Sequence, residues 1–183
     1  MNSNSYLSLS HHPEVLRAAD EAAHVFGAGP GAVRFIDGTA APHVDLERHI
    51  AAFVGRPGAR AFNSAYTSTL GLALTLSGPE TYWIGDALNH NCIIRAMRIA
   101  NVPQDRRAVF AHNDLRDLEA KLDAVPDGVA RVVVIFDGIF SMRGDNAPLD
   151  AIRSLALRHD GRFRDGVVTV MDDSHGIGAY GET

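Results

Sequence analysis

The sequence predicts an α/β domain in which a mostly parallel sheet carries helices on both faces. Two observations lead to this fold class. From residue 60 onward, short β-rich runs alternate with helical patterns, as in successive βαβ units. In addition, residues 132–136 (Val-Val-Val-Ile-Phe) are apolar at every position, which is typical of a strand covered by helices on both sides.

The elements of this domain are expected in a regular order along the chain. The clearest helical signal starts at Leu115, because the apolar residues at 115, 118, 122 and 125 fall on one helical face. Strands are expected at residues 61–62, 82–84, 108–110, 132–136 and 167–171. Helices are expected at residues 66–76, 89–100, 115–125 and 149–157.

The first 58 residues have a different pattern. A helix is expected at residues 13–26, stopped by Gly27, and a second at residues 43–54, closed by Gly55. The segment between them is rich in glycine. We therefore expect residues 1–58 to form a helical, glycine-rich lead-in and residues 59–183 to form the main domain.

Composition and charge exclude several classes of protein. Of the 183 residues, 46% are hydrophobic and 21% are charged, which is ordinary for a soluble globular chain. The net charge of −5 and the lack of a basic block argue against nucleic acid as a partner. No apolar run approaches the roughly 18 residues of a membrane helix, and the start does not resemble a secretory signal. With Cys92 as the single cysteine, a reducing, cytoplasmic location is expected, with no membrane partner.

Polar residues follow each predicted strand. In open α/β sheets, ligands bind outside the carboxyl ends of the strands, so these loops are expected to meet at one edge. They contain three histidines, several carboxylates and a Ser/Thr-rich turn. The loops are residues 63–68, 85–90, 112–114, 137–141 and 172–175.

Three features of these loops each allow a functional and a structural interpretation. The turn at 63–68 opens a helix, where free N–H groups and hydroxyls suit a phosphate but also suit ordinary N-capping. Asp172 follows a buried strand and either holds a cationic group protonated or caps the turn. His90 is at a helix start. There an imidazole can stack on a flat ligand, act as an acid or base, or have a structural role only.

Seven stretches, taken together and in this order, resemble one family of pyridoxal-phosphate enzymes, the α-oxoamine synthases. The sequence at residues 33–39 and 86–94 most resembles the glycine C-acetyltransferase (2-amino-3-ketobutyrate CoA ligase) branch of this family, and 8-amino-7-oxononanoate synthase is also similar. The stretches are 4–7 (Asn-Ser-Tyr-Leu), 33–39 (Val-Arg-Phe-Ile-Asp-Gly-Thr), 43–47 (His, with Leu-Glu at its end), 86–90 (Asp-Ala-Leu-Asn-His), 112–114 (His-Asn-Asp), 137–145 (Asp-Gly-Ile-Phe-Ser-Met, then Gly-Asp) and 172–176 (Asp-Asp-Ser-His-Gly).

The resemblance implies a fold type I large domain that binds pyridoxal 5′-phosphate, incomplete here because the small C-terminal domain is absent. It implies that the turn at Ser64, Ala65 and Tyr66 holds the cofactor phosphate. The remaining implied roles concern the ring: His90 stacks on it, Asp172 pairs with its nitrogen, His175 bonds its phenolic oxygen, and Ser141 lies beside it. His90, Ser141 and His175 are the implied catalytic residues, and no metal is implied.

The resemblance also implies a reaction and its partners. Family members condense an amino acid such as glycine with an acyl-CoA thioester, releasing coenzyme A, and they usually form homodimers. The family's Schiff-base lysine lies downstream of the Asp-Asp-Ser-His motif, whereas the only lysine here is Lys121, in a charged helical segment. We therefore expect a fragment of such an enzyme that is inactive by itself.

Two other hypotheses remain open. The first is a non-catalytic truncated relative, or a partner subunit that pairs with a full-length paralogue, because Thr69, Asn91 and Cys92 depart from the family pattern. The second is a metal-dependent hydrolase, which we rank last because the histidines lack tight metal-ligand spacing. Its candidate ligands are His90, His112, Asp137 and His175.

Overall fold

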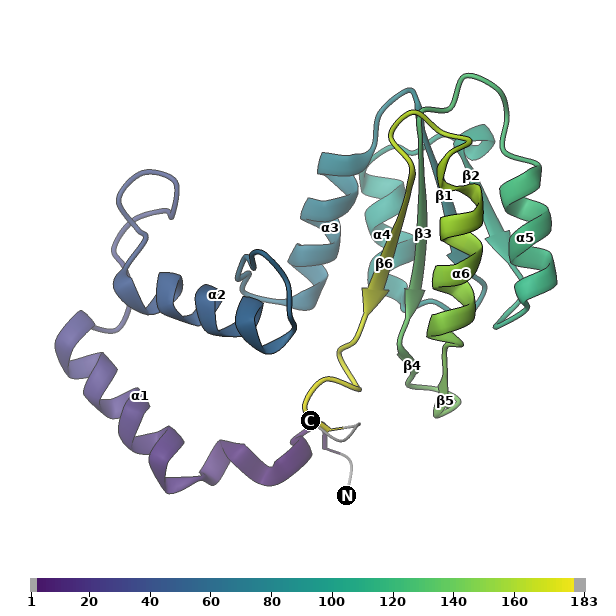
Figure 1. The fold of residues 1–183 in the computed structure, drawn as a ribbon. Helices are drawn as coiled ribbons and strands as arrows, with labels where there is room; N and C mark the ends of the chain where they lie inside the picture. The colour runs from purple at the N-terminus through teal and green to yellow at the C-terminus, as the bar shows by residue number, and fades with distance from the viewer. Residues whose placement is uncertain (1–2, 180–183) are drawn as a thin grey trace. The chain divides into compact units, whose positions relative to one another are not determined.

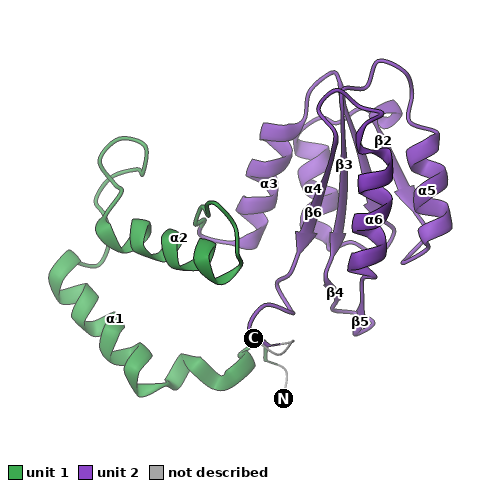
Figure 2. Ribbon diagram, viewed as in Figure 1, with its two compact units in different colours: residues 1–62 green, residues 63–183 purple. Residues whose placement is uncertain are grey.

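The computed structural model describes residues 3–179 of the chain. Its internal contacts divide it into two compact units, residues 1–62 and residues 63–183, which are coloured separately in Figure 2. Among the described residues, no helix combines the length and the apolar character needed to cross a bilayer.

Unit 2 contains a four-stranded sheet with the strand order β2-β1-β3-β6, and all of its strand pairs are parallel. The strands are β1 (Thr81–Asp86), β2 (Arg107–Phe110), β3 (Arg131–Asp137) and β6 (Val167–Asp172). Four of the five expected strands are therefore confirmed, each extended by one or more residues.

Helices cover both faces of this sheet, as Figure 1 shows. On one face, α3 (Ala65–Leu76) and α4 (Asn91–Ile99) pack against the side chains of Val133 and Ile135. On the other face, α5 (Leu115–Asp123) and α6 (Leu149–Asp160) pack against Val132, Val134 and Phe136.

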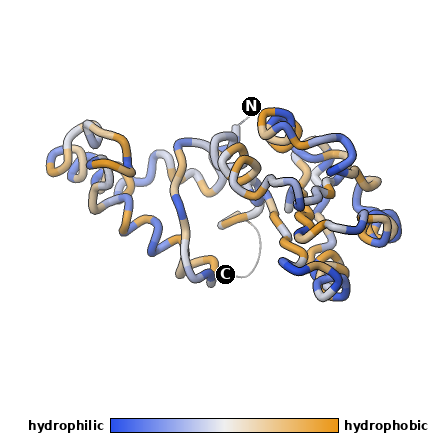
Figure 3. The backbone as a smooth tube through the Cα atoms, turned by 90° about the horizontal axis from the view of Figure 1, so that it is seen from above, coloured by the Kyte–Doolittle hydropathy of each residue, from blue (hydrophilic) through white to orange (hydrophobic). Residues whose placement is uncertain are grey.

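The alternation of β3 between the two faces explains the run of apolar residues in the sequence. Consecutive side chains of a strand point to opposite faces, and here each face has its own hydrophobic cluster. Helices α4, α5 and α6 are amphipathic, whereas α3 contains no charged residue. Figure 3 shows hydrophobic and hydrophilic residues mixed along the chain. The predicted α/β class with helices on both faces is confirmed.

The expected strand at residues 61–62 is wrong. These residues form no strand, and side chains of unit 1 make hydrogen bonds to the backbone of Ala61 instead. The Ala61 N–H donates to Glu47 at 2.8 Å, and the Ala61 carbonyl accepts a long contact of 3.5 Å from Arg34. A further difference is a short hairpin that the sequence did not indicate, formed by β4 (Ile139–Phe140) and β5 (Asp145–Asn146).

Unit 1 contains a 3-10 segment, Tyr6–His11, followed by α1 (Pro13–Phe26) and α2 (Ala41–Phe53). Both expected helices are confirmed, although α2 begins and ends slightly earlier than predicted. The loop between them is fixed by Glu47, which accepts two hydrogen bonds from Arg34, at 2.6 and 3.2 Å. These bonds and the Ala61 N–H lower the pKa of Glu47 to about 2.

Candidate active site at the carboxyl edge of the sheet

The carboxyl ends of the four parallel strands meet at one edge of unit 2. The strands end at Asp86, Phe110, Asp137 and Asp172, and the register pairs Asp137 with Asp172 on neighbouring strands. Because a helix that connects parallel strands runs antiparallel to them, α4 and α5 have their first turns at this same edge. The first turns of α3, which precedes β1, lie there too, since Thr69 contacts Cys92 at the start of α4. The edge therefore collects the loops that the sequence singled out.

Cys92 joins three of these elements. Its sulfur lies 3.8 Å from the Thr69 hydroxyl on α3 and 3.8 Å from a carboxylate oxygen of Asp172 at the end of β6. The residue is only 2% exposed, and burial raises the pKa of its thiol, so the sulfur is protonated and its single S–H can donate weakly to one of the two oxygens at a time. The starts of α3 and α4 and the end of β6 are thus brought together around one side chain.

The start of α3 combines capping with unused backbone donors. The Ser64 hydroxyl is the N-cap and accepts a hydrogen bond from the Thr67 N–H at 3.1 Å. Thr67 in turn donates its hydroxyl to Asn63 at 2.5 Å, which fixes the turn before the helix. Since Ala65 and Tyr66 are the first two helical residues, their N–H groups have no intrahelical carbonyl to bind and can serve an anion.

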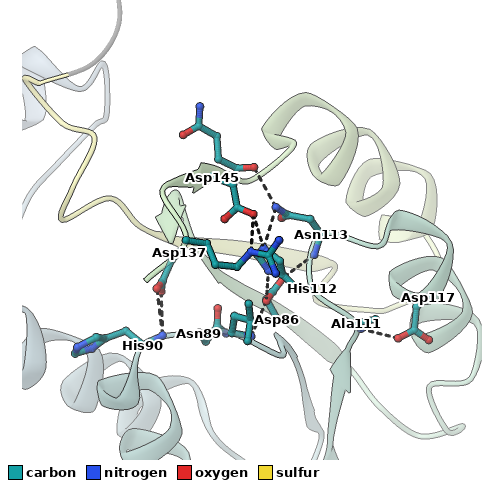
Figure 4. Close-up of polar contacts among 12 residues, drawn as sticks. Asp86, Asn89, His90, Ala111, His112, Asn113, Asp117, Asp137 and Asp145 are labelled. Carbon is teal, nitrogen blue, oxygen red and sulfur yellow. Dashed lines mark hydrogen bonds and ion pairs between the residues drawn. The ribbon is translucent and has the colours of Figure 1, made fainter. Parts of the chain in front are cut away.

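His90 is the N-cap of α4 and its ring is held by a local bond. Its Nδ1 accepts a hydrogen bond from the Cys92 N–H at 3.2 Å. Its own N–H donates to the buried Asp137 carboxylate at 3.1 Å, as Figure 4 shows. With Nδ1 used as an acceptor, the remaining proton of the neutral ring is on Nε2. The residue stays exposed, so the imidazole is anchored at one nitrogen and accessible at the other.

Asp172 shares its two carboxylate oxygens between different partners. One oxygen accepts from the N–H of Ser174 at 3.1 Å and from its hydroxyl at 2.5 Å. The other faces the Cys92 thiol. Within residues 3–179, no lysine or arginine forms an ion pair with Asp172 or with Asp137 beside it.

The negative charge of Asp172 raises the pKa values of the neighbouring acids. Burial, the largest cause, and the nearby charge of Asp172 together raise the pKa of Asp137 to about 6, against the opposing effect of the His90 N–H. Burial and Asp172 also raise the pKa of Asp173. A cationic group placed beside Asp172 would be stabilised by this environment.

The other two candidate residues lie on loops that leave the same edge. Ser141 begins the exposed turn between β4 and β5, and β4 follows directly on β3. His175 is half-buried in the turn that follows β6. Their contact with a bound ring stays a prediction.

The sequence did not reveal how His112 is used. Its Nδ1 lies 3.0 Å from Asp86 and its Nε2 lies 3.0 Å from Asp145, so both nitrogens face carboxylates (Figure 4). No group of three or more His, Cys, Asp or Glu side chains suited to a metal occurs in residues 3–179. The candidate metal set of His90, His112, Asp137 and His175 is therefore not assembled in the described part of the chain.

Lys121 lies away from this edge. It is near the end of α5, which runs back towards the amino ends of the strands, and it pairs with Asp117 on its own helix at 3.6 Å. Its side chain is partly exposed, as expected for a residue in a charged helical segment.

The parallel sheet with helices on both faces has the fold of pyridoxal-phosphate-dependent proteins of fold type I. Residues 1–183 match the family described as Aminotransferase class I and II, and the chain belongs to this family. The resemblance to the α-oxoamine synthases is confirmed, because the chain is similar to an 8-amino-7-oxononanoate synthase, a 2-amino-3-ketobutyrate coenzyme A ligase and a serine palmitoyltransferase, which are enzymes of that group.

Two curated relatives illustrate the similarity. The chain is 40% identical over 183 residues to an 8-amino-7-oxononanoate synthase of Exiguobacterium sibiricum, covering 100% of this chain and 44% of the relative. It is 38% identical over 180 residues to a 2-amino-3-ketobutyrate coenzyme A ligase of Escherichia coli, covering 98% of this chain and 43% of that protein. The chain therefore spans less than half the length of the curated relatives it matches.

Solved structures give the same result. A serine palmitoyltransferase of Sphingomonas wittichii superposes with a TM-score of 0.83 at 27% identity, covering 93% of this chain and 40% of that one. A serine palmitoyltransferase from S. paucimobilis that contains PLP superposes with a TM-score of 0.84 at 30% identity, covering 93% and 40% of the two chains.

The residues at the edge fit pyridoxal phosphate, the cofactor of this family. The cofactor carries a phosphate, a flat ring and a ring nitrogen that becomes cationic when protonated. The edge supplies matching groups: unused N–H donors at the start of α3, an exposed imidazole at residue 90, and a carboxylate at residue 172 with no Lys or Arg partner among residues 3–179. The chemistry of this donor set thus suits each part of the cofactor.

Proposed function

We propose that the chain is the cofactor-binding part of a pyridoxal-phosphate-dependent C-acyltransferase, which joins an amino acid such as glycine to an acyl group taken from acyl-CoA. The observation that supports it most is the clustering of the α3 start, His90 and Asp172 around Cys92. The names of the similar proteins support the reaction class, since one is named as a coenzyme A ligase of 2-amino-3-ketobutyrate.

In this proposal each group has a separate task. The N–H groups of Ala65 and Tyr66, after the Ser64 cap, bind the phosphate. Asp172 holds a proton on the ring nitrogen, and bound pyridoxal phosphate supplies an electron sink for the carbanion at the substrate α-carbon. His90 covers the ring, while His175 and Ser141 orient its phenolic oxygen and edge.

The only lysine, Lys121, is at the wrong edge of the sheet for a covalent link to a ring held in this way. We therefore infer that this chain binds the cofactor noncovalently and does not turn over substrate by itself. The alternative of a non-catalytic relative or partner subunit is supported by the unusual Thr69 and Cys92, which contact each other beside Asp172. A homodimer, or a heterodimer with a full-length paralogue, in the cytoplasm is the proposed setting.

The test is glycine-dependent release of coenzyme A from an acyl-CoA. We would assay the 183-residue chain, the chain extended by the coding sequence that follows it, and the chain mixed with a full-length paralogue, each with pyridoxal phosphate. We expect no release from the chain alone and release from the extended protein, lost in its Asp172→Ala variant. Release only in the mixture would favour the partner-subunit alternative, and no release with any amino acid in any sample would contradict both.

A further inference from the structure

His112 has a carboxylate partner at each of its two ring nitrogens, and the proposed function gives it no task. Its imidazole is 14% exposed and lies between Asp86, whose side chain is fully buried, and Asp145, whose side chain is 37% exposed. The ring edge also packs on Phe140, with the ring centroids 4.4 Å apart and the planes at 84°.

The geometry favours a doubly protonated ring. Both nitrogens lie 3.0 Å from carboxylate oxygens, which can only accept, and a neutral imidazole has one donor. Burial opposes the charge on His112, but the hydrogen bonds to Asp86 and Asp145 outweigh it and raise the pKa of the imidazole. The same contact with His112 lowers the pKa of Asp145, whose carboxylate also accepts from Arg143 at 3.1 Å.

The two carboxylates belong to different loops. Asp86 accepts from the N–H of Leu88 at 2.8 Å, which fixes the loop that leads from β1 to His90. Asp145 belongs to β5 and is paired in register with Phe140 of β4, so it fixes the hairpin whose turn begins at Ser141. Figure 4 shows His112 between the two acids.

The segment around His112 is itself tied to both sides. The N–H of Asn113 donates to the second oxygen of Asp86 at 2.9 Å, and the Asn113 side chain donates to the Asn146 carbonyl on β5 at 3.1 Å. Asn113 has a positive φ of 55°, a conformation that asparagine tolerates better than most residues. Residues 112 and 113 therefore bridge the end of β1 and the hairpin after β3.

We propose that His112 is a positioning residue: as an imidazolium between Asp86 and Asp145, it fastens the His90 loop and the Ser141 hairpin in one fixed relation. This inference rests on the proposed function only in assigning the cofactor to those two loops. The fastening is also expected in the chain without cofactor. Its contribution to stability is fully present below the ordinary pKa of histidine and is lost as the pH rises through the raised pKa of His112.

The test compares two histidines of similar burial. His112→Phe keeps an aromatic ring against Phe140 and removes both donors. His159→Phe is the control, because His159 on α6 is 13% exposed and its ring approaches one acid, Asp123, at 3.8 Å. We expect hydrogen exchange to become about tenfold faster in both segments 87–91 and 139–147 in His112→Phe, with the amides of β3 unchanged, and to stay at the wild-type rate in the control.

The cofactor gives the second readout. We expect the dissociation constant of pyridoxal phosphate to rise about tenfold in His112→Phe, because part of the binding free energy is then needed to order the two loops. Faster exchange with unchanged affinity overturns the positioning role. If wild-type protein binds no pyridoxal phosphate, the proposed function fails, while joint loosening of the two segments still supports the fastening.

Wild-type protein provides the same test where His112→Phe does not fold. The protonation of His112 is followed by NMR of its ring nitrogens while the pH is raised. As the ring loses a proton, amide hydrogen exchange, corrected for its intrinsic pH dependence, is expected to become faster in both segments together. Loosening of one segment alone, or of neither, overturns the inference, as does a neutral His112 ring at pH 7.

Discussion

Two pairs of carboxylates lie at the same edge of the sheet, and only one pair encloses a group that can carry a positive charge. Asp86 and Asp145 enclose His112, which bonds both. Asp137 and Asp172 lie side by side without an ion pair to Lys or Arg in the described residues, and the pKa of Asp137 is raised to about 6 by burial and by Asp172. The first pair stabilises the structure, whereas the second is suited to a cationic ligand group.

The largest expected effect is on the pair that encloses His112. Asp86→Ala removes a buried acceptor of the Leu88 and Asn113 N–H groups and leaves His112 without one partner. We expect the free energy of unfolding to fall by about 3–5 kcal/mol, measured by urea denaturation at pH 7. Asp145→Ala, at the half-exposed end of the same pair, should lose only about 1 kcal/mol. Equal losses in the two variants would show that burial does not distinguish them.

The next effect concerns the pair without an internal cation. Asp172→Asn replaces a carboxylate by an amide, so the proposed contact with a protonated ring nitrogen would no longer pair two opposite charges. We expect affinity for pyridoxal phosphate to fall by about 1.5–3 kcal/mol, or roughly 10- to 100-fold, in an absorbance titration. Asp173→Asn is the matched control at the adjacent residue and should bind as the wild type does. The same loss in both variants would mean that only the net charge matters.

A smaller effect of opposite sign is expected at Asp137. Asp137→Asn keeps an oxygen to accept the His90 N–H and removes the repulsion with Asp172. Because the pKa of this acid is raised in the folded state, its ionised form destabilises the fold above about pH 6, and this effect disappears as the pH falls towards 4. The variant should therefore be more stable by about 1–2 kcal/mol at pH 8 and equal to wild type near pH 4. A variant less stable at pH 8 would contradict the assigned cause.

The smallest effect is expected at the single lysine, which serves neither pair. Lys121→Ala removes one ion pair with Asp117 on the surface of α5. Thermal and urea denaturation should detect a change of no more than about 0.5 kcal/mol. Borohydride reduction of the wild-type complex should trap no stoichiometric adduct at Lys121. Such an adduct would show that the cofactor lies elsewhere than the carboxyl edge.

The sheet and its helices could be predicted from the sequence because their signals are local. Residues 132–136 are buried on both faces, and the apolar spacing from Leu115 marks the side of α5 that packs on the sheet. The strand expected at residues 61–62 failed because two apolar residues carry no information about hydrogen-bond partners. Glu47, far away in sequence, takes the Ala61 N–H instead.

The site was predictable only in part, for the same reason. His90 and Asp172 could be assigned to one edge, since parallel strands end together. The partners of His112 could not, because Asp86, His112 and Asp145 come from three separate segments whose pairing depends on the strand order and on a hairpin of two-residue strands. Likewise, nothing local in the sequence indicates that Cys92 lies between Thr69 and Asp172.

The most direct measurement is NMR mapping of backbone amide shifts during titration of the 183-residue chain with pyridoxal phosphate, with inorganic phosphate as the reference. We predict that phosphate alone shifts the amides of Ala65 and Tyr66, and that the cofactor in addition shifts Cys92 and residues 172–175. Shifts centred on the end of α5 around Lys121, or none at the starts of α3 and α4, would contradict a cofactor site at the carboxyl edge of the sheet.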